Sequence, residues 1–331
     1  MTVIKYSLSF QDNIIYMNIV VLDGFTLNPG DLSWKPLARL GNLDVYDRTD
    51  EHEFFNRASD ADVLLINKVS LDKNRILALP KLKLICVTAT GYNVVDVNQA
   101  RKSGILVANV PDYGTSAVAQ HVFAMLFNLY NPVAMHQKEV SDGAWSSSKD
   151  WCFWKQPIDN FDDKTLGVIG YGKIGQALAS RAKSFGMKII INTSTASVNK
   201  IYENVSIREL CMRSDIISLH CPLTQDNEGM VNKEFLDLMK SDSVLVNTAR
   251  GGLINEKDLA DCLNSNGIRA ALLDVLSQEP PPDHHPLIGL DNCYITPHQA
   301  WGSHQARQRL MDILIANVSS FLNGSPQNIV N

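Results

Sequence analysis

The chain has 331 residues, of which 45% are hydrophobic and 20% are charged, and its formal net charge is −5. This length exceeds what one hydrophobic core usually holds and predicts two domains, while the composition is typical of a soluble globular protein. The acidic balance and the lack of a long basic run argue against nucleic-acid binding through phosphate contacts.

The N-terminal region and the cysteines indicate the cellular compartment of the protein. Residues 1–16 carry no apolar core of the kind that a signal peptide needs, so we expect an N-terminal extension, either a loose tail or a stretch before an alternative start at Met17. The apolar stretch 14–22 is interrupted by Asn18 and is too short to span a membrane. The six cysteines form no CxxC pair and no cluster with metal-ligand spacing, which predicts free thiols in a reducing cytoplasm and no metal site.

From Met17 the chain alternates short apolar runs with helical stretches. The runs are rich in Val, Ile and Leu and predict strands over 18–22, 43–46, 63–66, 84–87 and 106–108. Alternating strand and helix order with apolar strands indicates a parallel sheet covered on both faces.

A helix and an aromatic loop separate this series from a second one. Val118, Val122, Leu126 and Leu129 have helical spacing, and Pro132 ends the pattern. The loop that follows carries Trp145, Trp151, Cys152, Phe153 and Trp154. The second series predicts strands over 166–169, 187–191, 215–219, 243–247, 270–274 and 293–296. Six strands with helices between them suit a dinucleotide-binding domain.

The last helix has Leu310, Leu314, Val318 and Phe321 on one face and Gly324 as its C-cap. Because it follows the second sheet, it is free to pack back onto the first domain. We therefore expect a discontinuous domain of residues 17–114 plus 302–331, a dinucleotide-binding domain of residues 115–301, and the extension 1–16.

The sharpest motif is the turn Gly170-Tyr171-Gly172-Lys173-Ile174-Gly175, which follows a predicted strand and opens a helix ending near Gly186. The first glycine permits a tight turn, the second lets the backbone approach a pyrophosphate, and the third lets the helix pack against the strand. The helix N-terminus, with the N–H groups around Lys173 and Ile174, then faces the phosphates.

The acidic residue expected about twenty positions later is missing. The second strand of this series ends in Asn192-Thr193-Ser194-Thr195, where Asp or Glu would hold the ribose 2′-hydroxyl. Hydroxyl and amide groups can donate to a 2′-phosphate, with Lys200 nearby in sequence, and no carboxylate repels that phosphate. The cofactor set therefore includes Thr193 and Ser194, and the sequence leans slightly towards NADPH over NADH.

Three segments after later strands carry candidate chemistry. Arg250, in Asn247-Thr248-Ala249-Arg250-Gly251-Gly252, is flanked by small residues and can bind a carboxylate with two parallel hydrogen bonds. Glu279 and His298 each follow a strand of the same sheet. A carboxylate beside an imidazole favours the protonated ring, which can supply the proton that reduction of a ketone requires.

The remaining histidines receive structural interpretations. We expect His52, His284, His285 and His304 to be loop or surface residues, and His136 to be exposed. His121 falls on the helix after Val118 and is expected to pack against its surroundings.

Taken together, the glycine turn, the Arg250 and Glu279 segments and Pro297-His298-Gln299-Ala300 resemble the D-isomer-specific 2-hydroxyacid dehydrogenases. The segments 21–30, with Asp23-Gly24, and 150–157, with Phe153-Trp154, are most similar to the glycerate dehydrogenase or hydroxypyruvate reductase branch. The resemblance implies an α/β fold of two doubly wound parallel-sheet domains, a flavodoxin-like substrate domain and a Rossmann cofactor domain, with a cleft between them.

The resemblance also implies a role for each site residue. His298 would be the acid/base, Glu279 would orient and charge it, and Arg250 would bind the substrate carboxylate and keto oxygen. Other residues would bind the carboxylate or shape the substrate pocket: Ala89, Thr90, Gly91, Tyr92, Lys68 and the loop 151–154. Asp274 would hold the nicotinamide carboxamide, and further residues would line the cofactor: Thr115, His220, Cys221, Pro222, Thr248, Ala249 and His298.

The implied activity is NAD(P)-dependent reduction of a small 2-keto acid, hydroxypyruvate or glyoxylate, to its D-2-hydroxy acid in a cytoplasmic homodimer. One alternative is a sister dehydrogenase acting on D-lactate, phosphoglycerate or phosphite. Another is a nucleotide-sensing binding protein that resembles a co-repressor and binds cofactor without turnover.

Overall fold

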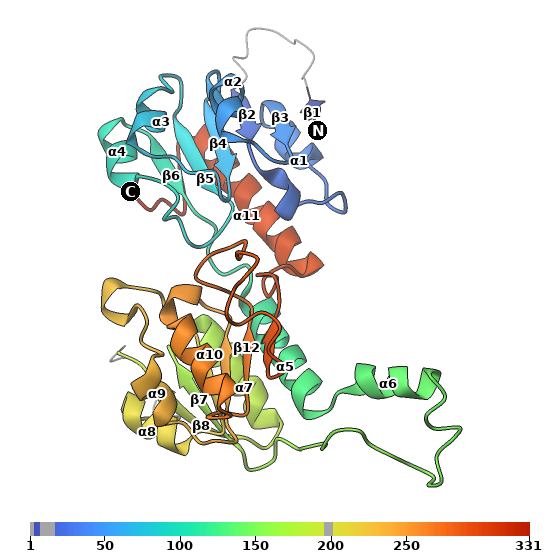
Figure 1. Ribbon diagram of the computed structural model, residues 1–331. Coiled ribbons are helices and arrows are strands. Elements are labelled where there is room, and N and C mark those ends of the chain that lie inside the picture. Colours follow the sequence, from blue (N-terminus) through green and yellow to red (C-terminus); the bar gives the residue numbers. More distant parts are fainter. Residues whose placement is uncertain (1–2, 7–16, 195–200) are drawn as a thin grey trace. The chain divides into compact units, whose positions relative to one another are not determined.

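The computed structural model describes residues 3–6, 17–194 and 201–331. The chain divides into two compact units, which we call unit 1 (Met1–Gly114 with Gly302–Asn331) and unit 2 (Thr115–Trp301). Each unit is a sheet with helices packed around it (Figure 1). No helix in the described ranges is both long enough and apolar enough to cross a membrane.

The sheet of unit 1 contains five parallel strands with one antiparallel strand at its edge. Its order is β1-β3-β2-β4-β5-β6, and the five parallel strands have the doubly wound order of flavodoxin-like folds. The parallel strands are β2 (Asn18–Val21), β3 (Asn42–Tyr46), β4 (Val63–Ile66), β5 (Leu84–Val87) and β6 (Leu106–Ala108). All four residues of β4 and of β5 are buried, as expected of strands covered on both faces.

The edge strand β1 (Val3–Tyr6) lies within the predicted N-terminal extension 1–16, so this part of the extension is not a loose tail. It pairs antiparallel with β3, from Val3 opposite Tyr46 to Tyr6 opposite Leu43. Its pairing partner is distant in sequence, and four residues carry too short a pattern to identify a strand. The remaining residues of that predicted extension, 1–2 and 7–16, lie outside the described ranges.

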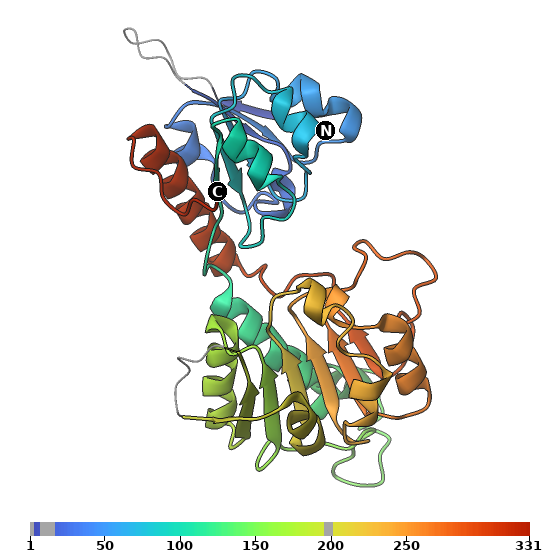
Figure 2. The ribbon, with the colours of Figure 1, turned by 90° about the vertical axis from the view of Figure 1, so that its left-hand side faces the viewer.

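The helices of unit 1 are mostly short, and α11 (His304–Leu322) is the long one that returns from the C-terminal end of the chain. Leu310, Leu314 and Val318 of the predicted apolar face are fully buried, and Phe321 is partly buried. Figure 2 shows α11 lying along the sheet of unit 1. The other helical elements are η1 (Gly24–Thr26), α1 (Lys35–Ala38), η2 (Glu51–Glu53), α2 (Phe54–Ala58), α3 (Lys73–Leu77) and α4 (Val97–Lys102).

An ion pair fastens the start of α11 to the loop after η1. Both terminal nitrogens of Arg307 donate to the Asp31 carboxylate at 2.6 Å, and Arg307 also donates to the carbonyls of Leu27 and Gly302. This contact lowers the pKa of Asp31 to about 2. The C-terminal segment is thereby bound to the N-terminal part of unit 1.

The sheet of unit 2 has seven parallel strands in the order β13-β12-β11-β10-β7-β8-β9. They are β7 (Thr165–Ile169), β8 (Lys188–Asn192), β9 (Glu203–Asn204), β10 (Ile216–Leu219), β11 (Val244–Asn247), β12 (Ala270–Leu273) and β13 (Cys293–Ile295). The strand order reverses between β7 and β10, which is the arrangement of dinucleotide-binding folds. The sequence predicted six of these strands and missed β9, which has only two residues.

Helices cover both faces of this sheet (Figures 1 and 2). They are α5 (Thr115–Tyr130), α7 (Lys173–Ser184), α8 (Ile207–Arg213), η3 (Gln225–Asn227), α9 (Lys233–Asp237), η4 (Gly251–Leu253) and α10 (Glu256–Asn264). A further helix, α6 (Val133–Ser141), occupies part of the predicted aromatic loop. None of its residues is buried, so it lacks the apolar periodicity that reveals a helix in sequence.

Candidate active site

The glycine turn lies between β7 and α7, and each glycine meets a different surrounding. Gly170 has a φ of +90°, and a side chain there would lie 2.4 Å from the backbone nitrogen of Cys221. A side chain at Gly175 would lie 2.4 Å from the Gly170 carbonyl oxygen, because the helix packs closely on the turn. At Gly172 an added carbon would meet open space. The turn therefore leaves room beside Gly172 and the helix N-terminus, as binding of a pyrophosphate requires.

The segment after β10 lies against this turn. The His220 N–H donates to the Ile169 carbonyl at 2.7 Å, and the His220 ring hydrogen-bonds the Ser218 hydroxyl at 2.9 Å. Burial lowers the pKa of His220 to about 4, so this imidazole is neutral at neutral pH. His220 and Cys221 are thus neutral residues beside the glycine turn, and Pro222 follows them in the chain.

The end of β8 carries the predicted cofactor-selecting residues. The Thr193 N–H donates to the Asn204 side-chain oxygen, and the Asn204 amide donates back to the Thr193 carbonyl, both at 3.2 Å. Ser194 is exposed. Asn204 was not singled out in the sequence, since its link to Thr193 depends on the unpredicted strand β9. Thr195 and Lys200 lie outside the described residues.

The segment after β11 holds Arg250 in place through the buried side chain of Asn247. The Asn247 amide accepts the Ala249 N–H at 3.0 Å and donates to the Arg250 carbonyl at 2.9 Å. The Arg250 guanidinium is exposed and donates to the Ala249 carbonyl at 2.7 Å. Gly251 is required here, because a side chain would lie 1.9 Å from the Leu276 carbonyl carbon.

Thr248, in the same segment, has a buried hydroxyl oxygen without a hydrogen-bond partner in the described parts of the chain. A buried polar atom without a partner is costly, and a bound group can supply the hydrogen bond that the protein does not. Together with the open space at Gly172, this hydroxyl fits a site for a polar cofactor at this edge of the sheet.

Asp274 follows β12 and organises the segment after β13. Its carboxylate is almost fully buried, and it accepts the N–H groups of Gln299 and Ala300 at 2.9 Å and the Thr296 hydroxyl at 2.6 Å. The His298 N–H donates to the Asp274 carbonyl at 2.8 Å. These contacts hold His298 at a φ of +50°, a left-handed conformation that is costly for a residue with a side chain.

His298 and Glu279 are in direct contact, as the sequence predicts. Nδ1 of His298 lies 2.6 Å from a carboxylate oxygen of Glu279, and each side chain is about one-third exposed. The other carboxylate oxygen of Glu279 accepts the Leu276 N–H at 3.1 Å. The contact occupies Nδ1 of His298, whereas Nε2 has no hydrogen-bond partner among the described residues.

Two other histidines of unit 2 have hydrogen-bond partners distant in sequence. Nε2 of His121 lies 3.0 Å from the Thr296 hydroxyl, so this residue supports the Asp274 cluster as well as packing on α5. His285 lies in a loop, as expected, but it is buried, and its Nε2 lies 3.1 Å from Glu256. The contact partner is 29 positions away in sequence, which no local pattern reveals.

Two loops of unit 1 carry the predicted substrate-binding residues. The loop after β5 is fixed by bonds from Asn109 to the Thr90 carbonyl at 2.8 Å and from the Thr90 hydroxyl to the Val110 carbonyl at 2.9 Å. It continues through Gly91 to Tyr92, which is 38% exposed. The loop after β4 holds the exposed Lys68.

Asp23 holds this second loop in place. Its carboxylate accepts three consecutive N–H groups, those of Asn67, Lys68 and Val69, at 2.6–3.0 Å. Burial raises the pKa of Asp23 although these donors act in the opposite direction.

The other predicted residues lie at different places in unit 2. Thr115 is the first residue of α5 and is partly exposed. Trp151 and Trp154 are 87% and 64% exposed, on the segment after α6.

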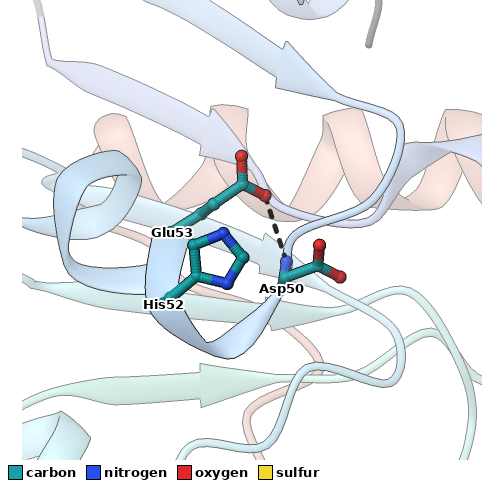
Figure 3. Close-up of side chains that lie close together, drawn as sticks. All are labelled: Asp50, His52 and Glu53. Carbon is teal, nitrogen blue, oxygen red and sulfur yellow. Dashed lines mark hydrogen bonds between the residues drawn. The ribbon is translucent and has the colours of Figure 1, made fainter.

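A cluster in unit 1 has the composition of a metal site. The ligand atoms of Asp50, His52 and Glu53 lie within 4.8 Å of one another (Figure 3). However, Asp50 and Glu53 cap the start of η2 through reciprocal bonds with each other's backbone, and Glu53 pairs with Arg57. These carboxylates already have donors, so we assign no metal to them.

Comparison with known proteins links this geometry to a family. Residues 123–300 match the model of the D-isomer specific 2-hydroxyacid dehydrogenase, NAD binding domain. The chain is 47% identical over 323 residues to a hydroxypyruvate reductase of Blautia hydrogenotrophica, covering 95% of this chain and 100% of the relative. It is 40% identical over 280 residues to a glycerate dehydrogenase of Methylorubrum extorquens, covering 84% and 88% of the two chains.

Solved structures agree with this placement. An acyclic imino acid reductase in complex with NADPH and D-Arg superposes with a TM-score of 0.83 at 36% identity, over 95% of this chain and 100% of the other. An NADPH-dependent glyoxylate/hydroxypyruvate reductase from Sinorhizobium meliloti, in complex with NADP and malonate, gives a TM-score of 0.80 at 25% identity, over 95% and 97% of the chains.

The open space at Gly172 gives a direct test of cofactor binding. Because Gly172 has ordinary extended backbone angles, Gly172→Ala should leave the Tm of the cofactor-free protein unchanged. The added methyl group should raise the Kd for NADPH at least about tenfold, or ~1.4 kcal/mol, by occupying the phosphate space. Thermal unfolding and a fluorescence titration measure the two effects.

The matched control is Gly289→Ala in the same unit, where the added carbon also meets open space but φ is +91°. It should lower Tm and leave the Kd unchanged. An unchanged Kd in Gly172→Ala would contradict the assignment of the turn to the cofactor phosphates.

Proposed function

The chain belongs to the D-isomer specific 2-hydroxyacid dehydrogenase family, and we propose that it reduces hydroxypyruvate to D-glycerate or glyoxylate to glycolate. The observation that carries this proposal is the 2.6 Å contact between His298 and Glu279, on the sheet edge that also holds Arg250 and the glycine turn. The similarity to hydroxypyruvate and glycerate enzymes supports the choice of substrate, which is a keto acid with a small polar side group or none.

His298 supplies the proton in this reaction. A nicotinamide cofactor, when bound, supplies the hydride for the keto carbon. The keto oxygen then takes the proton from Nε2 of His298, so that hydride and proton together convert the ketone to an alcohol. The Glu279 carboxylate accepts a hydrogen bond from Nδ1–H of His298. This bond fixes the orientation of the ring, and the negative charge of the carboxylate stabilises the protonated ring.

Arg250 binds the substrate carboxylate. Its guanidinium is exposed and its backbone is held by Asn247, so the planar group can form two parallel bonds to a carboxylate. In unit 1, we assign a substrate-binding role to the backbone of Ala89–Tyr92 and to Lys68. The bonds that hold both loops support this assignment, because a fixed loop loses little entropy on binding.

The cofactor residues are assigned on the same basis. The turn Gly170–Gly175 and the start of α7 would hold the pyrophosphate, and a bound cofactor would offer the buried Thr248 hydroxyl a polar partner. The remaining members of the set are Thr115, Thr193, Ser194, His220, Cys221, Pro222, Ala249, Asp274 and His298. Without a carboxylate at Thr193 or Ser194 to accept the ribose 2′-hydroxyl, we assign a modest preference for NADPH.

We further propose that the protein is a cytoplasmic homodimer. Its six cysteines are free thiols, which suits a reducing compartment. Helix α6 buries none of its residues, and Val133, Trp145, Trp151 and Trp154 on this segment are at least half exposed. Exposed apolar groups on one segment favour association, so light scattering should give about twice the 36.7 kDa chain mass. A mass of one chain at all concentrations would contradict the dimer.

The wild-type enzyme should oxidise reduced nicotinamide in the presence of hydroxypyruvate and of glyoxylate. We expect a higher kcat/KM with NADPH than with NADH, measured by the loss of nicotinamide absorbance. A higher kcat/KM with NADH would leave the proposed reaction standing and would overturn the assigned preference for NADPH. Oxidation of D-Arg faster than of D-glycerate would instead favour an imino acid reductase, the activity of one structural relative.

Replacing the proton donor tests the catalytic assignment. His298→Gln should lower kcat by roughly 10²–10⁴-fold, the usual effect of losing an acid–base group, and leave NADPH binding intact. The control is His304→Gln, at an exposed histidine, which should keep wild-type turnover. If His298→Gln retained turnover within about tenfold of the wild type, another residue would have to be the proton donor.

A further inference from the structure

Glu256, the first residue of α10, binds the segment that carries Glu279. One carboxylate oxygen accepts the Ser277 N–H at 2.7 Å, and the other accepts the Ser277 hydroxyl at 2.5 Å and lies 3.1 Å from Nε2 of His285. The Glu256 side chain is only 14% exposed, so these bonds are partly shielded from water. A carboxylate with three donors is a strong local anchor.

The hydrogen bonds of His285 define which ring nitrogen carries the hydrogen. The Leu287 N–H donates to Nδ1 at 3.3 Å, so Nδ1 acts as acceptor. Nε2 must then carry the hydrogen that it donates to Glu256. His285 is 6% exposed and Leu287 is fully buried, so the ring joins the end of this loop to the core of unit 2.

The anchor therefore holds the Glu279 segment on both sides. Ser277 precedes Glu279 by two positions and His285 follows it by six, and both bind the same carboxylate. Between them, Glu279 has one oxygen on the Leu276 N–H and the other on His298. Gly251 packs directly on the Leu276 backbone, so the Arg250 segment and the Glu279 segment also meet here.

We propose that Glu256, with Ser277 and His285, is a positioning unit that keeps Glu279 against His298. The inference rests on the proposed function, since it needs His298 to be the proton donor. Glu256 acts through Glu279 and does not touch the substrate. Loosening this unit separates Glu279 from His298, which disfavours the protonated ring and misaligns it.

The test compares Glu256→Gln with Glu279→Gln in steady-state reduction of hydroxypyruvate across a range of pH. The amide of Glu256→Gln has one acceptor oxygen in place of two, so it cannot accept all three hydrogen bonds. With its oxygen on the Ser277 hydroxyl and His285, its NH2 group faces the Ser277 N–H; with its oxygen on the Ser277 N–H, its NH2 group faces Nε2–H of His285. We expect a roughly tenfold lower kcat with unchanged KM for NADPH. The high-pH fall of kcat should move to lower pH, in the same direction as in Glu279→Gln.

A double variant and a matched control isolate the effect. Adding Glu256→Gln to Glu279→Gln should lower kcat little further, because both changes break one arrangement. Glu209→Gln is the control, since Glu209 also lies near a helix start and accepts both the N–H and the hydroxyl of one serine, Ser206. It should keep the wild-type pH profile. Ser277→Ala, at an exposed residue, should move the high-pH fall of kcat in the same direction as Glu256→Gln, but by less. This variant tests the positioning role if Glu256→Gln does not fold.

The outcomes separate this inference from the proposed function. If Glu279→Gln alone kept the wild-type profile, the His298–Glu279 assignment itself would fail, and the positioning role with it. If Glu279→Gln changed the profile while folded Glu256→Gln and Ser277→Ala did not, the proposed function would stand and the positioning role would be overturned.

Discussion

The candidate active site of unit 2 depends on the hydrogen bonds that the buried carboxylate of Asp274 accepts. This carboxylate accepts the N–H groups of Gln299 and Ala300 and the Thr296 hydroxyl, so it fixes the segment on both sides of His298. Without these bonds, the left-handed backbone of His298 would be too costly to maintain. The imidazole reaches Glu279 only because this segment is held against the end of β12.

The same arrangement recurs along the sheet edge. Three segments that follow strands are held by polar side chains: Asn247 holds Arg250 in its own segment, Asp274 after β12 holds the segment of His298, and in unit 1 Asp23 after β2 holds the backbone of Lys68. Small residues let neighbouring segments approach, as Gly170 does beside Cys221 and Gly251 beside Leu276. The side chains of Arg250, His298 and Lys68 thus lie on backbone segments that hydrogen bonds hold in place. Groups held in a fixed orientation lower the entropy cost of a reaction.

Sequence patterns revealed the parts that depend on local rules. Apolar runs located the longer strands within about two residues, the glycine spacing located the cofactor turn, and the shared sheet edge brought Glu279 to His298. They missed what depends on distant partners or weak periodicity. β1 and β9 are too short to carry a pattern, α6 has no buried face, and the buried loop residue His285 contacts Glu256, which lies 29 positions away on α10.

The most direct test of the central claim is the configuration of the product. Hydroxypyruvate and a reduced nicotinamide cofactor are incubated with the protein, and the glycerate formed is separated on a chiral column and compared with the cofactor oxidised. We predict D-glycerate in equal amount to the cofactor consumed, because hydride and the His298 proton are delivered in one fixed geometry. L-glycerate, or cofactor oxidation without glycerate, would contradict the assignment of this chain as a D-2-hydroxyacid dehydrogenase that reduces hydroxypyruvate.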